Sequence, residues 1–150
     1  MEAVMDREEG EQLLLDFGKL STTAEIAGLL PCAVQNVDTG EVILVAYVND
    51  AALTEAVAKR SAVFWSTSRN ELWEKGGTSG NTFELIEVRV NCEQNSLLYG
   101  VRPRRGGICH TRNSRGQPRN CFYRRINSPH PAGPARTPGS MSWHWDNRLA

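Results

Sequence analysis

The sequence predicts an α+β domain, and two kinds of pattern in the chain indicate this fold class. Runs rich in β-branched and aromatic residues recur between turn residues, as strands do in a sheet. Two other stretches carry the acidic first turn or the N-cap residue with which helices begin. We therefore expect helices and strands together in a chain of 150 residues, which is about the size of one domain.

The first expected element is a helix over residues 6–17. Its first turn is acidic, which suits the positive end of a helix dipole, and residues 13–15 and Phe17 are apolar. We expect this short N-terminal helix to pack against the rest of the domain.

Strands are expected from residue 31 onward. Residues 31–48 contain two β-rich runs around a short turn with Gly40, which is the pattern of a β-hairpin. Further strand-like runs lie at residues 62–66, 83–90 and 97–101.

A second helix and a loop separate these strands. Asn49 or Asp50 can cap a helix that runs to Arg60, and we expect this helix to pack on the hairpin. Residues 68–82 are polar and rich in glycine, so we expect a loop, and loops of this kind commonly carry function.

Composition limits the classes of protein to which the chain can belong. It is 40% hydrophobic and 23% charged, as a soluble domain is. Apolar stretches such as 42–48 fall far short of the roughly 20 residues that cross a bilayer, so no membrane association is expected. The acidic N-terminus lacks the features of a secretory signal, which favours a cytoplasmic location. We place one domain at 1–127 and a flexible Pro/Gly-rich tail at 128–150.

Charge is distributed unevenly along the chain. Residues 1–100 hold 7 Lys and Arg against 16 Asp and Glu, whereas residues 101–150 hold 10 against 1. The arginines of the second part could bind phosphate, nucleic acid or the acidic part of a partner subunit. A solvated or intersubunit salt-bridged face explains the same pattern.

Three of the four cysteines could bind a metal. Cys92, Cys109 and Cys121 lie in or beside polar segments, whereas Cys32 lies in an apolar run and is expected to be buried. Three thiolates make a tetrahedral zinc site that keeps one position open for water, as catalytic sites do. Their spacings match no common zinc ribbon, so buried free thiols remain an alternative.

His110 directly follows Cys109. It could be a fourth metal ligand, a proton shuttle beside a metal-bound water, or an ordinary surface histidine. Its place beside a candidate ligand favours the shuttle as much as the surface role.

The segment FWSTSRNELWEKGGTSGNT, residues 64–82, mixes hydroxyl groups, basic side chains and glycines with two tryptophans. This composition suits a loop that holds a phosphate and stacks on a heterocycle. It matches no standard phosphate-binding or dinucleotide fingerprint, and Trp65 and Trp73 are equally suited to a core. The residues alone indicate an anion-binding loop.

Four segments in order resemble the phosphoribosyl-AMP cyclohydrolases of histidine biosynthesis: WSTSRNELWEKGGTSGN, NCEQNSLLYGV, CHT and CFYRR. The resemblance covers roughly residues 28–126. It implies a twisted, mostly antiparallel sheet with flanking helices and an intertwined homodimer. It also implies hydrolytic opening of the adenine ring of phosphoribosyl-AMP, a small phosphorylated nucleotide, between N1 and C6.

The resemblance further implies roles for individual residues. It implies zinc bound by Cys92 of one subunit and by Cys109 and Cys121 of its partner, so that the dimer completes the active site. Zinc lowers the pKa of a bound water to roughly 7, and His110 is then the catalytic residue that relays a proton. The substrate-binding residues implied by the family pattern are Trp65, Ser66, Ser68, Arg69, Trp73, Lys75, Thr78 and Ser79.

One departure from the family pattern concerns magnesium. The family usually carries Asp-Cys-Asp-x-Asp around its first cysteine, a magnesium-binding cluster, whereas this chain has Asn91, Glu93 and Asn95 at the three acidic positions. Because Mg²⁺ prefers carboxylate oxygens, we expect weaker binding at this degenerate site. A looser ion, more ligands from substrate phosphates, and loss of the metal remain open.

The spacer between Cys109 and Cys121 is the second departure, because it is longer than in the family and adds Arg115 and Arg119. The closure entropy of a loop grows only with the logarithm of its length, so the zinc site can tolerate the insertion. Because of these two departures, one alternative function stays open: the protein could be a paralogue that hydrolyses a related purine-like nucleotide. A structural zinc protein and a non-catalytic nucleic-acid-binding protein are alternatives of other classes. No nucleic-acid partner is expected, because the arginines and tryptophans lie inside the enzyme pattern.

Overall fold

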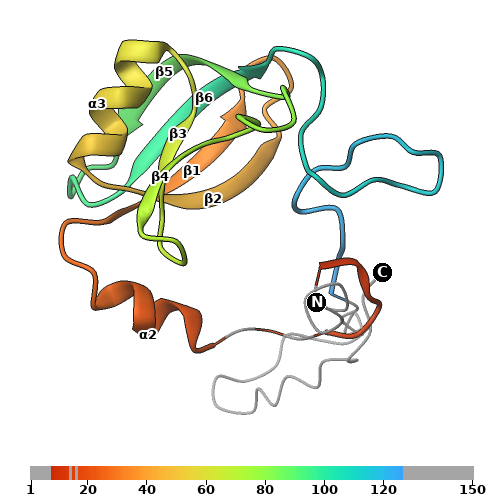
Figure 1. Ribbon diagram of the computed structural model, residues 1–150, viewed down its shortest axis with the longest axis horizontal. Helices are drawn as coiled ribbons and strands as arrows, with labels where there is room; N and C mark the ends of the chain where they lie inside the picture. The colour runs from red at the N-terminus through yellow and green to blue at the C-terminus, as the bar shows by residue number, and fades with distance from the viewer. Residues whose placement is uncertain (1–7, 14, 16, 127–150) are drawn as a thin grey trace, which may run out of the picture. The chain divides into compact units, whose positions relative to one another are not determined.

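The computed structural model (Figure 1) describes residues 8–13, 15 and 17–126 of the chain. The tail expected at 128–150 lies outside the described residues. No helix in the described ranges is long and apolar enough to cross a membrane.

The chain divides into two units. One unit is Phe17–Phe122, and the other combines the chain ends, Met1–Asp16 with Tyr123–Ala150. In the second unit the Tyr123 hydroxyl donates a hydrogen bond to the carbonyl of Glu8 at 2.9 Å. The sheets, the second helix and the candidate site all belong to the first unit.

A four-stranded sheet forms the centre of the first unit. Its order is β2-β1-β6-β5, where the strands are β1 (Leu30–Asn36), β2 (Val42–Val48), β5 (Phe83–Val90) and β6 (Leu97–Pro103). The β1–β2 and β5–β6 pairs are antiparallel, and the β1–β6 pair is parallel. The α+β class and the mostly antiparallel sheet are therefore confirmed.

The expected hairpin is present as β1 and β2. The side-chain oxygen of Asn36 accepts from the backbone N–H of Asp38 at 2.9 Å, and Gly40 has a φ of +75°. Arg102 of β6 donates two hydrogen bonds to the Asp38 carboxylate, at 2.7 and 2.9 Å. A short Asx turn thus closes the hairpin, and an ion pair joins the turn to β6.

The expected second helix is also confirmed, as α3 (Asp50–Lys59). The side chain of Asn49 caps it by accepting from the N–H of Ala52 at 2.9 Å, and Arg60 ends it in the left-handed conformation with a φ of +49°. The helix packs on β3 (Val63–Ser66) and on β2 of the hairpin.

The prediction of a continuous loop at 68–82 is wrong in part, because β4 (Glu71–Glu74) lies within it and pairs with β3 as a second, two-stranded sheet. The strand pairs on one side only, and Glu71 and Leu72 are exposed. A strand of this kind lacks the apolar run that marks a buried one, so the sequence reads as a polar loop.

The expected helix over residues 6–17 is also wrong in its extent. Residues 10–13 are not helical, and α2 forms instead at Lys19–Ala24. Phe17, expected to pack, is 87% exposed. The run of leucines explains the error, because three consecutive apolar residues lack the i, i+3, i+4, i+7 repeat of an amphipathic helix.

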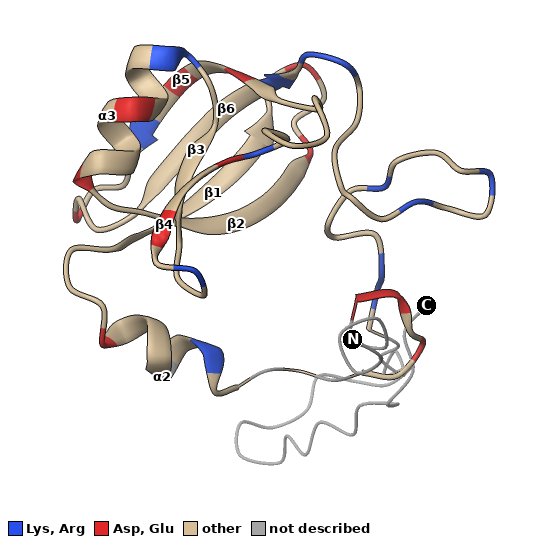
Figure 2. Ribbon diagram, in the orientation of Figure 1, with Lys and Arg blue, Asp and Glu red and all other residues tan. Residues whose placement is uncertain are grey.

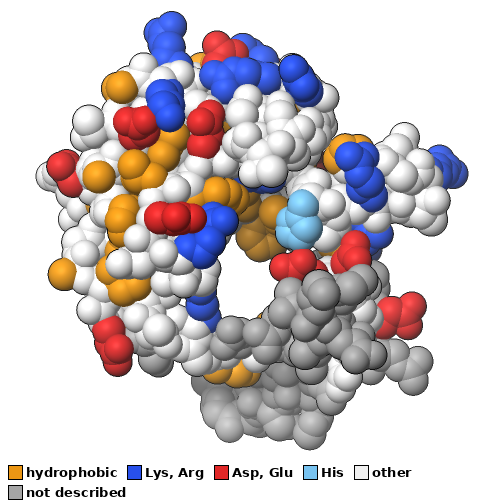
Figure 3. All heavy atoms as spheres, in the orientation of Figure 1, with side chains coloured by type: hydrophobic (Ala, Val, Ile, Leu, Met, Phe, Trp, Pro, Cys, Tyr) orange, Lys and Arg blue, Asp and Glu red, His pale blue; other side chains and the backbone are white. Residues whose placement is uncertain are grey.

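Aromatic side chains fill the space between the two sheets. The ring of Phe64 in β3 lies 5.5 Å from that of Tyr99 in β6, and the Tyr99 hydroxyl donates to the carbonyl of Val63 at 3.3 Å. In the space-filling view, hydrophobic side chains also reach the surface near α3 (Figure 3), and Val57 of that helix is 57% exposed. The helix and the β3–β4 sheet therefore form an outer layer over the core.

We expect Asn49→Ala to lower the free energy of unfolding by about 1 kcal/mol, because the N–H of Ala52 loses its cap acceptor. Chemical denaturation measures the change. Asn49→Ser is the control, since a serine hydroxyl can accept the same bond and should restore most of the stability. Equal losses in both variants would contradict the capping role.

Candidate active site

A pocket of about 330 Å³ is lined by two segments that lie far apart in the sequence, 73–81 and 108–112. It contains four of the eight expected substrate-binding residues together with one expected zinc ligand and the expected catalytic residue. These six are Trp73, Lys75, Thr78, Ser79, Cys109 and His110.

The first segment is a tight turn built on glycine. Gly76 has a φ of +77°, and its carbonyl accepts from the N–H of Gly80 at 2.8 Å. A Cβ atom on Gly76 would lie 2.0 Å from the carbonyl oxygen of Asn81, which is far inside contact distance. Only glycine permits this close approach.

The base of this turn is anchored to the neighbouring strands through Ser61. The Ser61 hydroxyl donates to the Glu74 carboxylate at 2.9 Å and accepts from the Arg104 guanidinium at 3.1 Å. Arg104 also donates to the Thr82 hydroxyl at 3.1 Å, and the N–H of Lys75 donates to the carbonyl of Ala62 at 3.0 Å. Both ends of the turn are thereby held.

Trp73 forms a wall of the pocket and is braced from behind. Its ring lies 5.3 Å from the ring of Phe64, and its side chain is partly buried against the core. The Phe64 ring in turn contacts Tyr99, so an unbroken aromatic row runs from the pocket into the sheet.

The second segment meets the first at Gly107. A Cβ atom there would lie 2.4 Å from the side-chain carbon Cγ of Asn81, so the glycine lets the two segments touch. Ile108, which follows, packs against the core and lines the pocket.

Residues 109–119 fold back on themselves as a small hairpin. The N–H of Cys109 donates to the carbonyl of Arg119 at 2.9 Å, and the N–H of Arg119 donates to the carbonyl of Thr111 at 3.2 Å. These two bonds bring the end of the hairpin back beside Cys109. The Cys121 thiol lies within hydrogen-bonding reach of the Cys109 sulfur. The long spacer therefore keeps the two cysteines together.

The pKa of the Cys109 thiol is lowered by its surroundings. Burial acts to raise its pKa, but hydrogen bonds from Thr111 and Cys121 and the charge of His110 outweigh burial, so the pKa is lowered from its ordinary value. The Thr111 hydroxyl donates to the sulfur at 3.3 Å, and Nδ1 of His110 lies 4.0 Å from it. A thiolate is the form that ligates metals.

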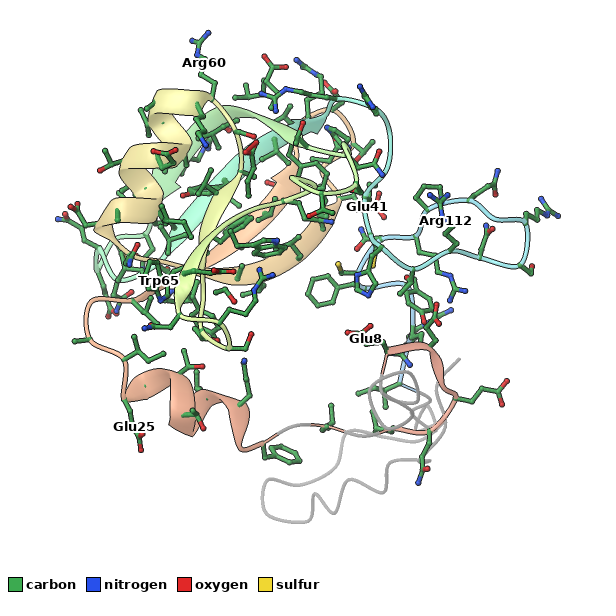
Figure 4. The ribbon with its side chains drawn as sticks, in the orientation of Figure 1. Glu8, Glu25, Glu41, Arg60, Trp65 and Arg112 are labelled. Carbon is green, nitrogen blue, oxygen red and sulfur yellow. The ribbon has the colours of Figure 1, made fainter. Side chains whose placement is uncertain are left out.

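The surroundings of the second segment are basic. Between residues 102 and 122 the side chains of Asp, Glu, Lys and Arg type are all arginines, and Figure 2 draws these positions in blue. One of them, Arg112, lines the pocket, and Figure 4 labels it at the start of the small hairpin.

Asn120 ties the end of the hairpin to the first sheet by donating to the Glu41 carboxylate at 3.0 Å and to the carbonyl of Val42 at 2.9 Å.

Within one copy of the chain the expected zinc ligands are only partly assembled. Cys92 lies exposed in the β5–β6 turn, and no group of three or more His, Cys, Asp or Glu among the described residues could hold a metal ion. Cys109 and Cys121 fit zinc as a thiol pair. The expected burial of Cys32 is confirmed, and burial raises the pKa of its thiol to about 12.

The other four expected substrate-binding residues do not line this pocket. Trp65, Ser66, Ser68 and Arg69 lie at the end of the β3–β4 hairpin, where the guanidinium of Arg69 lies 3.4 Å from the Ser66 hydroxyl. Figure 4 labels Trp65, whose ring N–H is buried and has no hydrogen-bond partner within the described part of the chain.

Sequence reasoning missed the residues that shape the pocket. Gly76, Asn81 and Gly107 make the close approaches, whereas Arg112, which also lines the pocket, belongs to the arginines that the sequence offers for phosphate binding. The glycines of the loop were a visible signal, but the contact of Asn81 with Gly107 joins residues 26 positions apart. No local sequence pattern predicts a contact between residues so far apart.

We expect Gly76→Ala to unfold or distort the pocket turn and to cost about 2 kcal/mol or more, because the new methyl group overlaps backbone. Gly116→Ala is the matched control. Gly116 also has a positive φ, +73°, but nothing lies within 4 Å of the added atom, so backbone strain of about 1 kcal/mol is the whole cost. Denaturation curves of the two variants decide the matter, and equal losses would contradict the close packing at Gly76.

Comparison with known proteins covers both pocket segments. A family model described as phosphoribosyl-AMP cyclohydrolase matches residues 44–123. Relatives with that name include a Hyphomonas neptunium protein, 46% identical over 66% of this chain and 71% of its own length. Others are from Thermobifida fusca, 44% identical over 63% and 77%, and Archaeoglobus fulgidus, 42% identical over 66% and 86%. The chain belongs to the phosphoribosyl-AMP cyclohydrolase family, which is a family of hydrolases.

Proposed function

We propose that the protein is a zinc-dependent phosphoribosyl-AMP cyclohydrolase of histidine biosynthesis, which hydrolyses the N1–C6 bond of the adenine ring. The pocket carries this proposal, because it combines an anion-binding turn with a thiol of lowered pKa and a histidine. The names of the relatives support the same reaction.

The substrate's charged groups would bind to the basic and hydroxyl side chains of the pocket. Lys75 and Arg112 supply cations from the two segments, and Thr78 and Ser79 supply hydroxyl donors. Charge-assisted hydrogen bonds of this kind are the strong ones for phosphate. The ring of Trp73, held by the aromatic row, provides a flat face for a purine.

Cys109 and Cys121, together with Cys92 of a second copy, would hold the zinc ion. Bound zinc would supply a Lewis acid that lowers the pKa of water to roughly 7. The lowered pKa of Cys109 supports its role as a ligand, and the exposed position of Cys92 leaves it accessible to a second copy.

His110 would move the proton that the reaction requires. Addition of water at C6 and cleavage of the N1–C6 bond leave N1 in need of a proton. His110 lines the pocket beside Cys109, and an imidazole ring can both accept and donate a proton. General acid–base catalysis of this kind contributes about 10²- to 10⁴-fold in rate.

We expect purified protein to turn over phosphoribosyl-AMP, followed spectroscopically as the ring opens, and Cys109→Ser to lose both zinc and turnover. Cys32→Ala is the matched control, because Cys32 is buried away from the pocket and its loss should leave zinc content and turnover in place. Retained turnover in the serine variant would contradict the proposal. A folded, zinc-loaded protein that leaves phosphoribosyl-AMP intact would favour the related purine-like nucleotide instead.

We also expect inactive Cys92→Ser and Cys109→Ser proteins to regain activity when mixed and allowed to exchange subunits. A mixed dimer would contain one site with all three thiols, so random exchange should restore about a quarter of the wild-type sites. Zinc content and turnover of the mixture measure the recovery. Mixing that restores nothing, although mixed dimers form, would contradict a site shared between subunits.

A further inference from the structure

The turn between β5 and β6, residues 91–96, holds the three positions at which the family pattern carries its magnesium-binding carboxylates. In this chain they are Asn91, Glu93 and Asn95, and their side chains lie together in one hydrogen-bonded row. The row determines whether a cation can bind there.

Asn91 uses all of its polar groups within the turn. Its side-chain oxygen accepts from the N–H groups of Asn95 and Ser96, each at 2.9 Å. Its own N–H donates to the carbonyl of Ser96 at 3.2 Å, and its carbonyl accepts from the N–H of Gln94 at 3.0 Å. Its side-chain N–H donates to the Asn95 side-chain oxygen at 2.6 Å.

Asn95 continues the row toward the remaining carboxylate. Its side-chain N–H donates to Oε2 of Glu93 at 3.0 Å. The oxygens of Asn91 and Asn95 and one oxygen of Glu93 therefore each accept a hydrogen bond. Of the side-chain oxygens at these three positions, only Oε1 of Glu93 accepts none from the described residues.

These residues do not fit a magnesium ion. Mg²⁺ requires oxygen ligands in near-octahedral geometry and is bound through carboxylates. Here the Asn91 oxygen accepts two N–H donors, which use both of its lone pairs, and the Asn95 oxygen and Oε2 of Glu93 each accept one more, so these oxygens are largely committed to the turn. Three carboxylates at these positions would repel one another and need a cation between them, whereas two amides and one carboxylate satisfy each other directly.

We infer that the β5–β6 turn binds no Mg²⁺ in this protein, and that the row Asn91–Asn95–Glu93 holds the turn closed in its place. Cys92 lies inside the turn, between Asn91 and Glu93, so the row also fixes the backbone that presents this thiol. The inference concerns the turn alone and holds whatever the substrate of the pocket is.

Thermal unfolding of the full-length protein, in buffer freed of divalent ions by a chelating resin but with its zinc retained, tests the inference. Millimolar MgCl₂ should shift the unfolding temperature of the wild type by less than about 1 °C relative to NaCl of equal ionic strength, because an ion that binds the folded state must stabilise it. The double variant Asn91→Asp, Asn95→Asp replaces the two amide donors by carboxylates. Its unfolding temperature should fall by about 3 °C or more without Mg²⁺ and recover when Mg²⁺ is added.

Asn113→Asp is the matched control for the chemical change. Asn113 has the same kind of role in the turn of the small hairpin, where its oxygen accepts from the N–H groups of Arg115 and Gln117 at 2.9 Å and its N–H donates to the Gln117 side chain at 3.0 Å. No acidic residue lies between 94 and 145, so the new carboxylate has no acidic neighbour in its turn and its variant should not respond to Mg²⁺.

A wild-type shift as large as that of the double variant would overturn the inference. A double variant as stable as the wild type without Mg²⁺ would overturn the role of the row. If the double variant does not fold, calorimetric titration of MgCl₂ into the wild type decides: saturable binding overturns the inference, and heats of dilution alone support it.

Discussion

Phe64 lies between Tyr99 of the central sheet and Trp73 of the pocket wall, and the candidate site depends on this pair of ring contacts. Full burial of one large aromatic side chain contributes about 1.5–3 kcal/mol, and Phe64 and Tyr99 are both completely buried. The Tyr99 hydroxyl, Ser61 and Arg104 also tie the β3–β4 hairpin and its flanks to the four-stranded sheet, and the aromatic row fixes the position of the Trp73 ring among these contacts. A pocket wall packed on the core in this way is rigid, and a rigid wall can hold a bound group in a fixed orientation.

The two sides of the pocket are held by different means. The turn at 76–81 is shaped by backbone contacts that only glycine permits, whereas the segment at 108–112 is held by a local hairpin and by the Asn120 contact with the first sheet. The sides meet closely where Asn81 contacts Gly107. The pocket therefore combines a tight glycine turn with a thiol and a histidine carried by a separately folded piece of chain.

The regular elements of the first unit could be predicted because their signals are local. The β1–β2 hairpin has a turn glycine, α3 has an asparagine cap, and the core strands have apolar runs. The half-exposed strand β4 and the start of α2 were missed, since neither has a repeating apolar face. At the pocket, residue types predicted Lys75, Cys109 and His110 as site residues, and the structure brings them together, but the closeness of Asn81 and Gly107 arises from tertiary packing. The amide row also escaped sequence reasoning, which could count the lost carboxylates but not see their replacements bond to one another.

The small hairpin after Cys109 has one more consequence. Its turn is closed by its own hydrogen bonds, with Asn113 at the centre and the Arg112 guanidinium donating to the carbonyl of Gly116 at 2.9 Å. Because the hairpin is held by hydrogen bonds within itself, it can be replaced by a hairpin of different length or charge while Cys109 and Cys121 stay close together. Natural variation or protein engineering can therefore change the charge carried beyond Arg112, at Arg115 for example, while Arg112 stays in the lining of the pocket.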